Sequence, residues 1–321
     1  ASTNSQPFPT PSKCGIHPAR GYEPRQVSNE TIPDNVQLGN DQLGFNGSAA
    51  SRTTQEVDSV FGELIFPVVT STMNVPFVKS FEIGLAFRYE KFKDTDNILK
   101  QEASFDNINP DEDFGGSPRL SIRYQPINDL TLRATASQSY QAPAPNQLFL
   151  PVVQDFPVLV DPFNPGGTVT VQPPDGVYRG GNPNLRPETT DEYTAGFVYS
   201  PSYIKGLTIT VDYYNLFTTN LIIDGNSYAQ FLLSSNIVDP DGAGNGAGFP
   251  GAPGGTGLGV TRFADGTLDS IDSSIFNAGR RNVQGLDITA LYQLPTASSG
   301  TFTLSGGLNT SSPYIMDTVP C

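Results

Sequence analysis

The stretch that decides the fold is FEIGLAFRYE, residues Phe81–Glu90. Its odd-numbered positions are large and apolar, whereas its even-numbered positions are small or charged. Successive side chains of a β-strand point to opposite faces of the sheet, so this alternation gives one apolar and one polar face. The stretch therefore predicts a strand that separates an apolar from a polar environment.

The same alternation recurs along the chain and predicts about eight strands of roughly ten residues, the length that a tilted barrel strand needs to cross a bilayer. Further stretches with this pattern are Leu120–Tyr124, Leu130–Ser137, Tyr193–Tyr199, Leu207–Tyr213, Leu286–Tyr292 and Phe302–Leu308, with a weaker one over Val57–Phe66. Short connections near 67–76, 126–129, 200–206 and 295–300 alternate with long ones over 93–116, 141–187 and 218–282. Short turns on one side and long loops on the other are typical of an outer-membrane barrel, although a soluble sandwich also has alternating strands.

Tyrosines mark one end of the predicted apolar face. Tyr124, Tyr199 and Tyr292 lie on that face, each just before a short turn. A tyrosine suits a membrane–water interface because its ring is apolar and its hydroxyl is polar, but tyrosine is also a common strand residue. The opposite face would line a hydrated lumen, contact a plug or, in a sandwich, face solvent; it carries Arg88, Arg123, Thr131, Arg133, Thr208, Asp212, Asp287 and Thr289.

The composition excludes several classes of function. Among 321 residues, 18 Lys and Arg stand against 32 Asp and Glu, and a net charge of −14 opposes nucleic-acid binding. The single histidine, His17, excludes a multi-histidine metal site. Cys14 and Cys321 are too few for a zinc site or a disulfide scaffold, while one disulfide within or between chains stays open. No apolar run reaches the 18 or so residues of a transmembrane helix.

Three stretches resemble TonB-dependent receptors of the Gram-negative outer membrane. Ser117–Pro143 is similar to the family's hairpin, in which an S-P-K/R strand turns through Q-P and returns as T-L-R-A before F-R-A-P. Tyr140 stands there in place of Phe, and Gln141 in place of Arg. Val60–Pro67 is similar to the family's V-Y/F-x-E-L-x-x-P strand.

The third stretch, Gly181–Tyr199, resembles the family's N-P-x-L-K/R-P-E-x-S/T motif, which is the most specific of the three. Its matching residues are Asn182, Pro183, Leu185, Arg186, Pro187 and Glu188. We interpret this motif as structural, because its two prolines fix φ and lead the chain rigidly from a loop into a strand. Arg186 and Glu188 are spaced to pair at the mouth of that strand.

The resemblance implies an all-β fold, an antiparallel up-and-down transmembrane β-barrel with long extracellular loops. We expect an extracellular loop region over residues 1–54, barrel strands and loops over 55–311, and a tail over 312–321. No plug, TonB box or closing strand is recognisable, and about eight strands cannot close a cylinder of 22. We therefore expect a segment of a larger receptor, a truncated product or a domain reused elsewhere.

The resemblance also implies uptake of a large scarce ligand, a ferric siderophore, cobalamin or an oligosaccharide, across the bacterial outer membrane. The expected partners are outer-membrane lipid and the TonB complex, reached through a plug that we do not find in this chain. No cofactor, metal site, nucleic acid or catalytic residue is expected. The main alternative is a secreted all-β structural protein that forms an extracellular fibre or surface layer, since exposed strand edges favour pairing between chains. A soluble β-sandwich binding module is a third.

Five loop residues are the candidates for ligand binding. Arg280 and Arg281 follow a long loop and suit an anionic ligand, or else a salt bridge to the acidic loops. Asp111 and Asp113 belong to an acidic cluster that would attract cations, or else form a solvated rim. Tyr178 would stack on a ligand ring, or else pin long loops together.

Overall fold

The computed structural model describes residues 15–38, 50–98, 100–106, 116–223, 229–235, 259–277, 279–296, 300–312 and 315–317. Its main element is an antiparallel sheet in which nine strands follow the order β1-β2-β3-β5-β6-β11-β12-β17-β18. These strands are β1 (His17–Thr31), β2 (Ser51–Val69), β3 (Ser80–Asp96), β5 (Ser117–Ile127), β6 (Leu130–Gln141), β11 (Glu188–Tyr199), β12 (Leu207–Thr219), β17 (Arg280–Thr296) and β18 (Gly300–Ser311).

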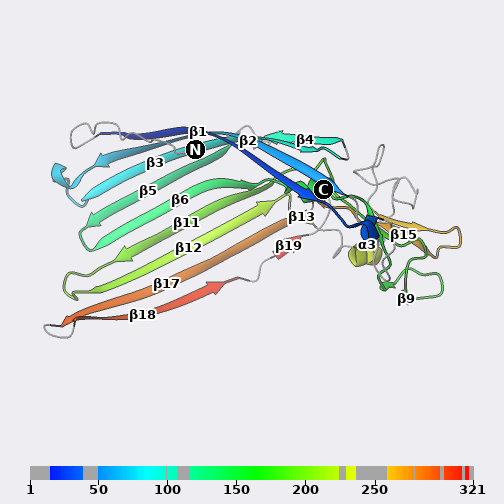
Figure 1. Ribbon diagram of the computed structural model, residues 1–321. Helices are drawn as coiled ribbons and strands as arrows, with labels where there is room; N and C mark the ends of the chain where they lie inside the picture. Colours follow the sequence, from blue (N-terminus) through cyan, green and yellow to red (C-terminus); the bar gives the residue numbers. More distant parts are fainter. Residues whose placement is uncertain are drawn as a thin grey trace.

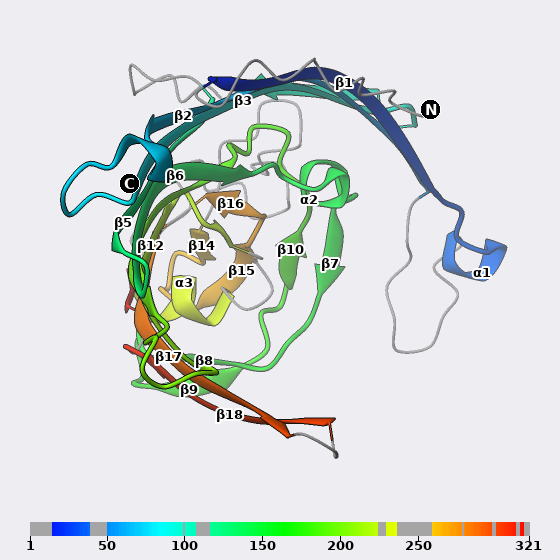
Figure 2. The same ribbon diagram turned by 90° about the vertical axis from the view of Figure 1, so that its left-hand side faces the viewer.

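The sheet is strongly curved and forms part of the wall of a cylinder (Figures 1 and 2). The short connections lie at one end of the strands and the long ones at the other, as the sequence predicts. β1 and β18 are the two edges of the nine-stranded order, and both run from the short-turn end to the long-loop end. The predicted all-β, antiparallel up-and-down architecture is thus confirmed.

The two ends of the chain contain more strand than the sequence predicts. Residues 1–54 are not only a loop region, because β1 occupies His17–Thr31 and β2 begins at Ser51. The expected tail, residues 312–321, contains β19 (Ile315–Asp317), which pairs with β17 beyond the end of β18. The register of β19 on β17 differs by one residue from that of β18.

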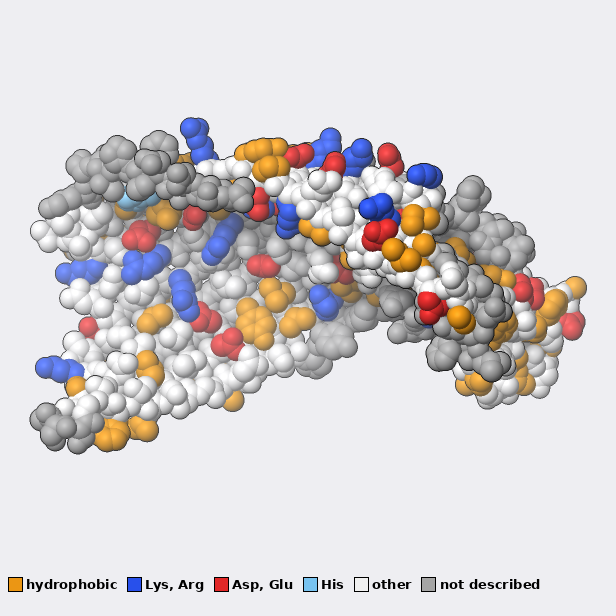
Figure 3. All heavy atoms as spheres, viewed as in Figure 1, with side chains coloured by type: hydrophobic (Ala, Val, Ile, Leu, Met, Phe, Trp, Pro, Cys, Tyr) orange, Lys and Arg blue, Asp and Glu red, His pale blue; other side chains and the backbone are white. Residues whose placement is uncertain are grey.

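Apolar side chains align in rows across the convex face of the sheet. Leu64 lies opposite Leu85, Leu85 opposite Leu120, and Leu120 opposite Ala136. The exposed fractions of the three leucines are 39%, 44% and 42%, in that order. Burying such a side chain is worth about 1.5–3 kcal/mol, so a belt left exposed needs an apolar environment outside the protein. Charged side chains lie on the concave face, as Figure 3 shows.

The buried apolar side chains of the described residues lie almost wholly in the loops. Only Val57 and Phe92 of the main sheet belong to them. The remainder come from the long connections 142–187 and 220–279, whose elements pack together at the loop end of the sheet (Figure 2). The wall therefore has little apolar core of its own, and the described core belongs to the loops.

Two long loops from neighbouring hairpins share one small sheet, with the order β14-β15-β10-β7. Val177 of one loop pairs with Ile271 of the other, and both side chains pack with Leu232 and Leu233. The loop elements are α2 (Pro145–Phe149), β7 (Val153–Asp155), β8 (Leu159–Asp161), β9 (Val169–Val171), β10 (Val177–Arg179), β13 (Ile222–Ile223), α3 (Ala229–Ser235), β14 (Gly259–Arg262), β15 (Leu268–Asp272) and β16 (Phe276–Asn277). The other short elements are α1 (Asn35–Leu38), η1 (Ser71–Met73) and β4 (Gln101–Asp106), which pairs with β3.

Among the residues that the structure describes, no helix has the length and apolar composition needed to cross a membrane.

Candidate functional site

A row of charged residues crosses the concave face of the sheet, which we call the lumenal face. Glu82 lies opposite Arg123, and Arg123 opposite Arg133. Arg123 Nη1 is 3.4 Å from Glu82 Oε1. Arg133 donates from Nε and Nη2 to Asp212 Oδ1 and Oδ2, at 2.9 and 2.5 Å. Such a row suits a hydrated interior, because charged groups lose much solvation in an apolar one.

The bond between Arg133 and Asp212 passes over Gly196, which lies between them on β11. A Cβ atom at Gly196 would stand 2.1 Å from Asp212 Oδ1 and 2.4 Å from the carbonyl oxygen of Val211. The glycine is therefore required for this bidentate pair, which links β6 to β12 across the strand between them.

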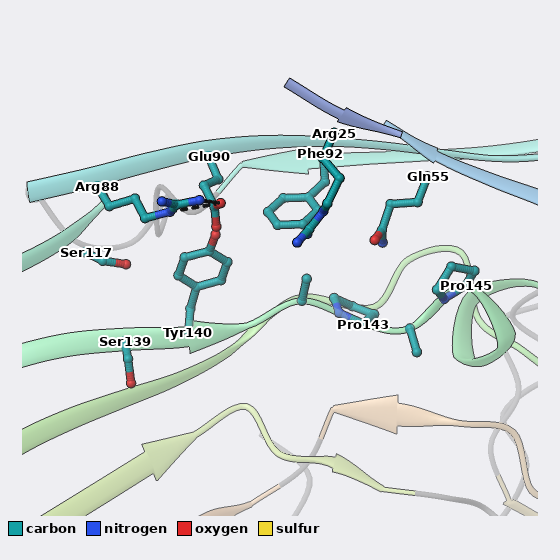
Figure 4. A pocket seen from close by; sticks show the side chains of 12 residues that line it. Arg25, Gln55, Arg88, Glu90, Phe92, Ser117, Ser139, Tyr140, Pro143 and Pro145 are labelled. Carbon is teal, nitrogen blue, oxygen red and sulfur yellow. Dashed lines mark hydrogen bonds and ion pairs between the residues drawn. The ribbon is translucent and has the colours of Figure 1, made fainter. Parts of the chain in front are cut away.

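A cavity of about 600 Å³ lies near the loop end, between the lumenal face of β1, β2 and β3 and the end of β6. Its walls come from β1, β2 and β3, from the facing ends of β5 and β6, and from residues 142–145, which lead into α2. Figure 4 shows Arg25 reaching from β1 beside Phe92, and Tyr140 reaching from β6 toward Arg88 and Glu90. Its volume falls within the roughly 300–1,000 Å³ of small-molecule pockets.

One side of the cavity is an internally satisfied ion cluster. Arg88 Nη2 lies 2.6 Å from Glu90 Oε1 and 3.2 Å from Glu23 Oε2. Ser59 donates a further hydrogen bond to Glu90 Oε1 at 2.6 Å. The Arg88 guanidinium also stands over the ring of Phe61, 5.5 Å from its centroid. The charge of Arg88 is therefore engaged by this chain's own side chains.

The other side of the cavity holds groups without partners. The rings of Phe92 and Tyr140 meet edge to face with centroids 6.0 Å apart. The Tyr140 hydroxyl is buried and has no hydrogen-bond partner. Arg25, in the described part of the chain, forms neither a hydrogen bond nor an ion pair, although its side chain lines the cavity. Buried polar groups are nearly always satisfied, so the lone hydroxyl has hydrogen-bonding capacity for water or a ligand.

The N-P-x-L-R-P-E motif connects the loop core to β11. Asn182 Oδ1 accepts a hydrogen bond from the backbone N–H of Asn184 at 2.9 Å, which fixes the turn. Leu185 is buried against Leu148 and Phe149 of α2. Every interaction described for these residues thus holds the loop in place at the mouth of the strand.

Glu188 does not pair with Arg186, contrary to the spacing argument. Its Oε1 accepts the backbone N–H of Ile222 at 2.7 Å. Arg186 is instead held through its backbone by Asn277, whose Oδ1 accepts from the Arg186 N–H at 2.7 Å and whose Nδ2 donates to the Arg186 carbonyl at 2.8 Å. Asn277 Nδ2 also donates to the carbonyl of Asn220 at 2.8 Å. One amide thereby ties together β16, the motif and the end of β12.

A buried ion pair joins the two long loops. Arg262 Nη1 and Nη2 lie 2.7 and 2.8 Å from Asp161 Oδ2 and Oδ1. The Asp161 side chain is fully buried, and that of Arg262 is 16% exposed. Hydrogen bonding to Arg262 holds the pKa of Asp161 below its usual value, against the opposing effect of burial.

Tyr178 contacts loop residues. Its hydroxyl donates to Asp175 Oδ1 at 3.2 Å and accepts from Gln154 Nε2 at 3.0 Å. Burial and the nearby Asp175 raise the pKa of Tyr178 to about 12. These contacts match the loop-pinning alternative for this residue, whereas its proposed stacking on a ligand stays a prediction.

The two arginines that open β17 point to opposite faces of the sheet. Arg281 lies opposite Thr218, in phase with Asp287 on the lumenal face, and Arg280 lies on the other face. Both are exposed, and neither forms an ion pair in the described ranges, so a salt bridge to described acidic residues is not present. Asp111 and Asp113 lie outside the described residues.

Sequence reasoning missed the residues that the cavity brings together. Arg25 fell in a stretch expected to be a loop, and Tyr140 was noted only as a departure from the family pattern. The departure itself was the available signal, since Tyr differs from Phe by the hydroxyl that is now without a partner. In the described ranges, no group of three or more His, Cys, Asp or Glu side chains suits a metal ion.

Comparison with solved structures finds receptors of low sequence identity. The FrpB iron transporter from Neisseria meningitidis is 10% identical, with a TM-score of 0.49, over 94% of this chain and 34% of that one. The siderophore receptor PirA from Pseudomonas aeruginosa is 15% identical, with a TM-score of 0.40, over 92% of this chain and 51% of that one. A mutant ferric enterobactin receptor, PfeA, from the same species is 17% identical, with a TM-score of 0.43, over 91% and 41%. This chain thus spans about a third to a half of their lengths.

No curated protein matches the chain. The sequence profile of the family described as TonB dependent receptor-like, beta-barrel matches residues 16–320, which is nearly the whole chain. The match includes β1 and β19, two strands at the ends of the chain that our sequence analysis did not predict. The chain therefore belongs to the TonB-dependent receptor family and forms part of a β-barrel of the bacterial outer membrane.

Proposed function

We propose that this chain is the wall and outer mouth of a receptor that takes up a large, scarce ligand through the outer membrane. The ligand classes are those that the family resemblance implies: a ferric siderophore, cobalamin or an oligosaccharide. The proposal includes no enzymatic step. The loops and the lumenal face bind the ligand. The ligand passes through the barrel when a plug that fills the lumen is displaced.

One observation carries this proposal, namely the division of the sheet into an exposed apolar face and a charged concave face. The convex rows contain leucines that are about two-fifths exposed, such as Leu85 at 44%. The concave face carries the Arg133–Asp212 pair and the cavity. A wall that faces lipid on one side and water on the other needs this division.

The remaining partners follow from the geometry of such a wall. Outer-membrane lipid would cover the convex rows, and a plug from another part of the receptor would occupy the concave side. Because the lumen of a large barrel is otherwise an open channel, transport of a bulky ligand requires that this plug be moved. The TonB complex of the inner membrane would supply that energy.

The test is uptake by cells that express the full receptor with and without a functional TonB complex. Accumulation of labelled ferric siderophore, cobalamin and oligosaccharide would be measured in both strains. We expect one of the three to accumulate only when the receptor and the TonB complex are both present. Equal accumulation without TonB would refute the proposal.

Membrane extraction separates the receptor from the fibre and sandwich alternatives. The receptor is expected in the outer-membrane fraction and should dissolve only with detergent. Recovery from the medium as a sedimenting assembly would support the fibre, and a monomer in plain buffer would support the soluble module. Either result would remove the lipid-facing role of the convex rows.

A further inference from the structure

The cavity on the lumenal face has unused hydrogen-bonding capacity, and that capacity consists mainly of donors. Gln55 already donates from Nε2 to Asp94 Oδ1 at 3.0 Å, and Ser139 donates to Glu192 Oε1 at 2.7 Å. The groups left over are the guanidinium of Arg25 and the hydroxyl of Tyr140. Arg25 is exposed, and a guanidinium has five N–H donors and no acceptor, so a ligand that binds it must supply acceptor oxygens.

The two arginines that line the cavity differ in their contacts. Arg88 lies within ion-pair distance of two carboxylates, those of Glu90 and Glu23. Arg25 forms no ion pair with a described residue, so it is the lining cation that a ligand's carboxylate can contact. Planar guanidinium groups bind carboxylates with two parallel hydrogen bonds, so a single carboxylate matches both the charge and the geometry. A ligand with three or more negative charges would leave most of them unpaired here.

The rest of the lining favours a flat apolar body next to that carboxylate. Phe92 is 3% exposed and stands edge to face with Tyr140 beside Arg25 (Figure 4). The facing wall carries Pro143 and Pro145, whose rings present apolar surface. Aromatic rings prefer edge-to-face or offset contacts with other rings, which an aromatic ligand supplies.

We propose that this cavity binds the aromatic monocarboxylate portion of the receptor's ligand. Arg25 holds the carboxylate, the Tyr140 hydroxyl donates to one of its oxygens, and Phe92 packs against the ring. The inference rests on the proposed uptake function, which it narrows to ligands with a single aromatic carboxylate at the recognised end.

The experiment measures binding of benzoate and of its uncharged analogue benzamide to the complete receptor, purified in detergent, by titration calorimetry or ligand-observed NMR. We expect benzoate to bind at least about tenfold more tightly than benzamide, because benzamide lacks the negative charge that strengthens hydrogen bonds to a guanidinium. Arg25→Gln should weaken benzoate binding about tenfold or more and leave benzamide unchanged. Tyr140→Phe, which restores the residue usual in the family, should weaken benzoate binding several-fold.

Arg119→Gln is the matched control. Arg119 is an exposed arginine in phase with Ser137 on the lumenal face, and it does not line the cavity. Its replacement makes the same charge change and should leave benzoate affinity unaltered. Correct assembly of each variant would be checked by its heat-dependent migration in gels.

Equal affinity for benzoate and benzamide, or unchanged benzoate binding by Arg25→Gln, would overturn the inference. An equal loss in Arg119→Gln would also overturn it, since the effect would then reflect the general charge of the lumen. Failure of TonB-dependent uptake is a separate result, because benzoate binding is measured on the purified receptor and does not require transport.

Discussion

At the scale of single residues, the most buried ion pair described in the chain joins the two long loops. Asp161 is fully buried and bound by both terminal nitrogens of Arg262. Removing one partner of a buried pair costs about 3–5 kcal/mol, because the other charge is left without compensation. The loops are thereby fixed to each other at a point far from the hairpins that carry them.

Asp161→Asn should therefore loosen the shared loop sheet by about 3 kcal/mol. Hydrogen exchange of the β10 and β15 backbone amides would measure the change. Asp155→Asn is the control, since the side chain of Asp155, the partner of Arg179, is 50% exposed and such pairs are worth at most about 1 kcal/mol. Equal effects of both substitutions would contradict the role assigned to the buried pair.

The same pair predicts how loop stability depends on pH. The folded pKa of Asp161 lies below its usual 3.8, so its contribution is complete above the unfolded pKa and is lost as pH falls through the lower folded value. As far as Asp161 determines it, the hydrogen-exchange protection of the β10 and β15 amides should stay constant from pH 7 to about 5. It should decrease below about pH 4. Asp161→Asn should remove this drop in amide protection at low pH. A drop of the same size in the variant would show that another titrating group causes it.

Asn277 predicts a second effect, on the motif that leads into β11. Asn277→Ala removes three hydrogen bonds to backbone groups of Arg186 and Asn220. With about 1 kcal/mol per bond, the expected loss is about 2–3 kcal/mol of local stability, seen as faster exchange at the start of β11. Asn184→Ala is the control, because the Asn184 side chain is exposed and no hydrogen bond is described for it. Unchanged exchange in Asn277→Ala would show that the motif holds without this amide.

Contacts of this kind between single residues could not be predicted from the sequence. Asn277 lies 91 residues from Arg186, and Asp161 lies 101 residues from Arg262. Nothing in either local pattern indicates the partner, because both contacts depend on two loops folding together. The motif itself was recognisable, since its prolines act locally.

At the scale of elements, the alternation of apolar and polar residues was the pattern that predicted the strands. Strands such as β3 and β12 have the period of two because one face meets an apolar medium and the other a polar one. β1 lacks that pattern: its convex positions include Pro18, Arg20 and Pro24, which lie opposite Leu64, Gly62 and Asp58. An edge strand tolerates proline, since one row of its backbone amides has no partner in the sheet. The strand was missed for this reason.

The two faces of β6 give a direct test of the lipid-facing belt. Ala134 lies on the convex face opposite Ile122 and Ala195, whereas Thr135 lies on the lumenal face opposite Ser121 and Thr194. Ala134→Arg should destabilise membrane insertion by about 2–4 kcal/mol, and Thr135→Arg by much less. The folded fraction in outer membranes, measured by heat-dependent gel migration, would report the difference. Similar losses at both positions would mean that the convex face does not meet lipid.

At the scale of the whole molecule, the sheet has two edges that described residues leave open. Every described residue of β18 is exposed, and β18 pairs only with β17 among the described strands. Unpaired backbone groups in a bilayer cost several kcal/mol each, so the edges must be covered there. The open edges could be predicted from the sequence, because the resemblance implied a barrel of 22 strands and the pattern predicted only about eight.

Closure of the cylinder predicts a difference in backbone exchange at the edge. In the complete receptor, the amides of β18 should exchange as slowly as those of β12, which is paired on both sides by β11 and β17. In residues 1–321 alone, β18 should exchange much faster than β12. Rapid exchange of β18 in the complete receptor would show that no strand joins this edge.

The shared direction of β1 and β18 also imposes a parity rule on whatever completes the ring. An odd set of nine antiparallel strands begins and ends in the same sense, so two copies in the same orientation, joined with β18 of one against β1 of the other, would meet in parallel. All neighbouring strands of the ring are antiparallel only if the number of added strands is odd. The first and last added strands must then run opposite to β1 and β18. A 22-stranded ring satisfies the rule, because it requires 13 more.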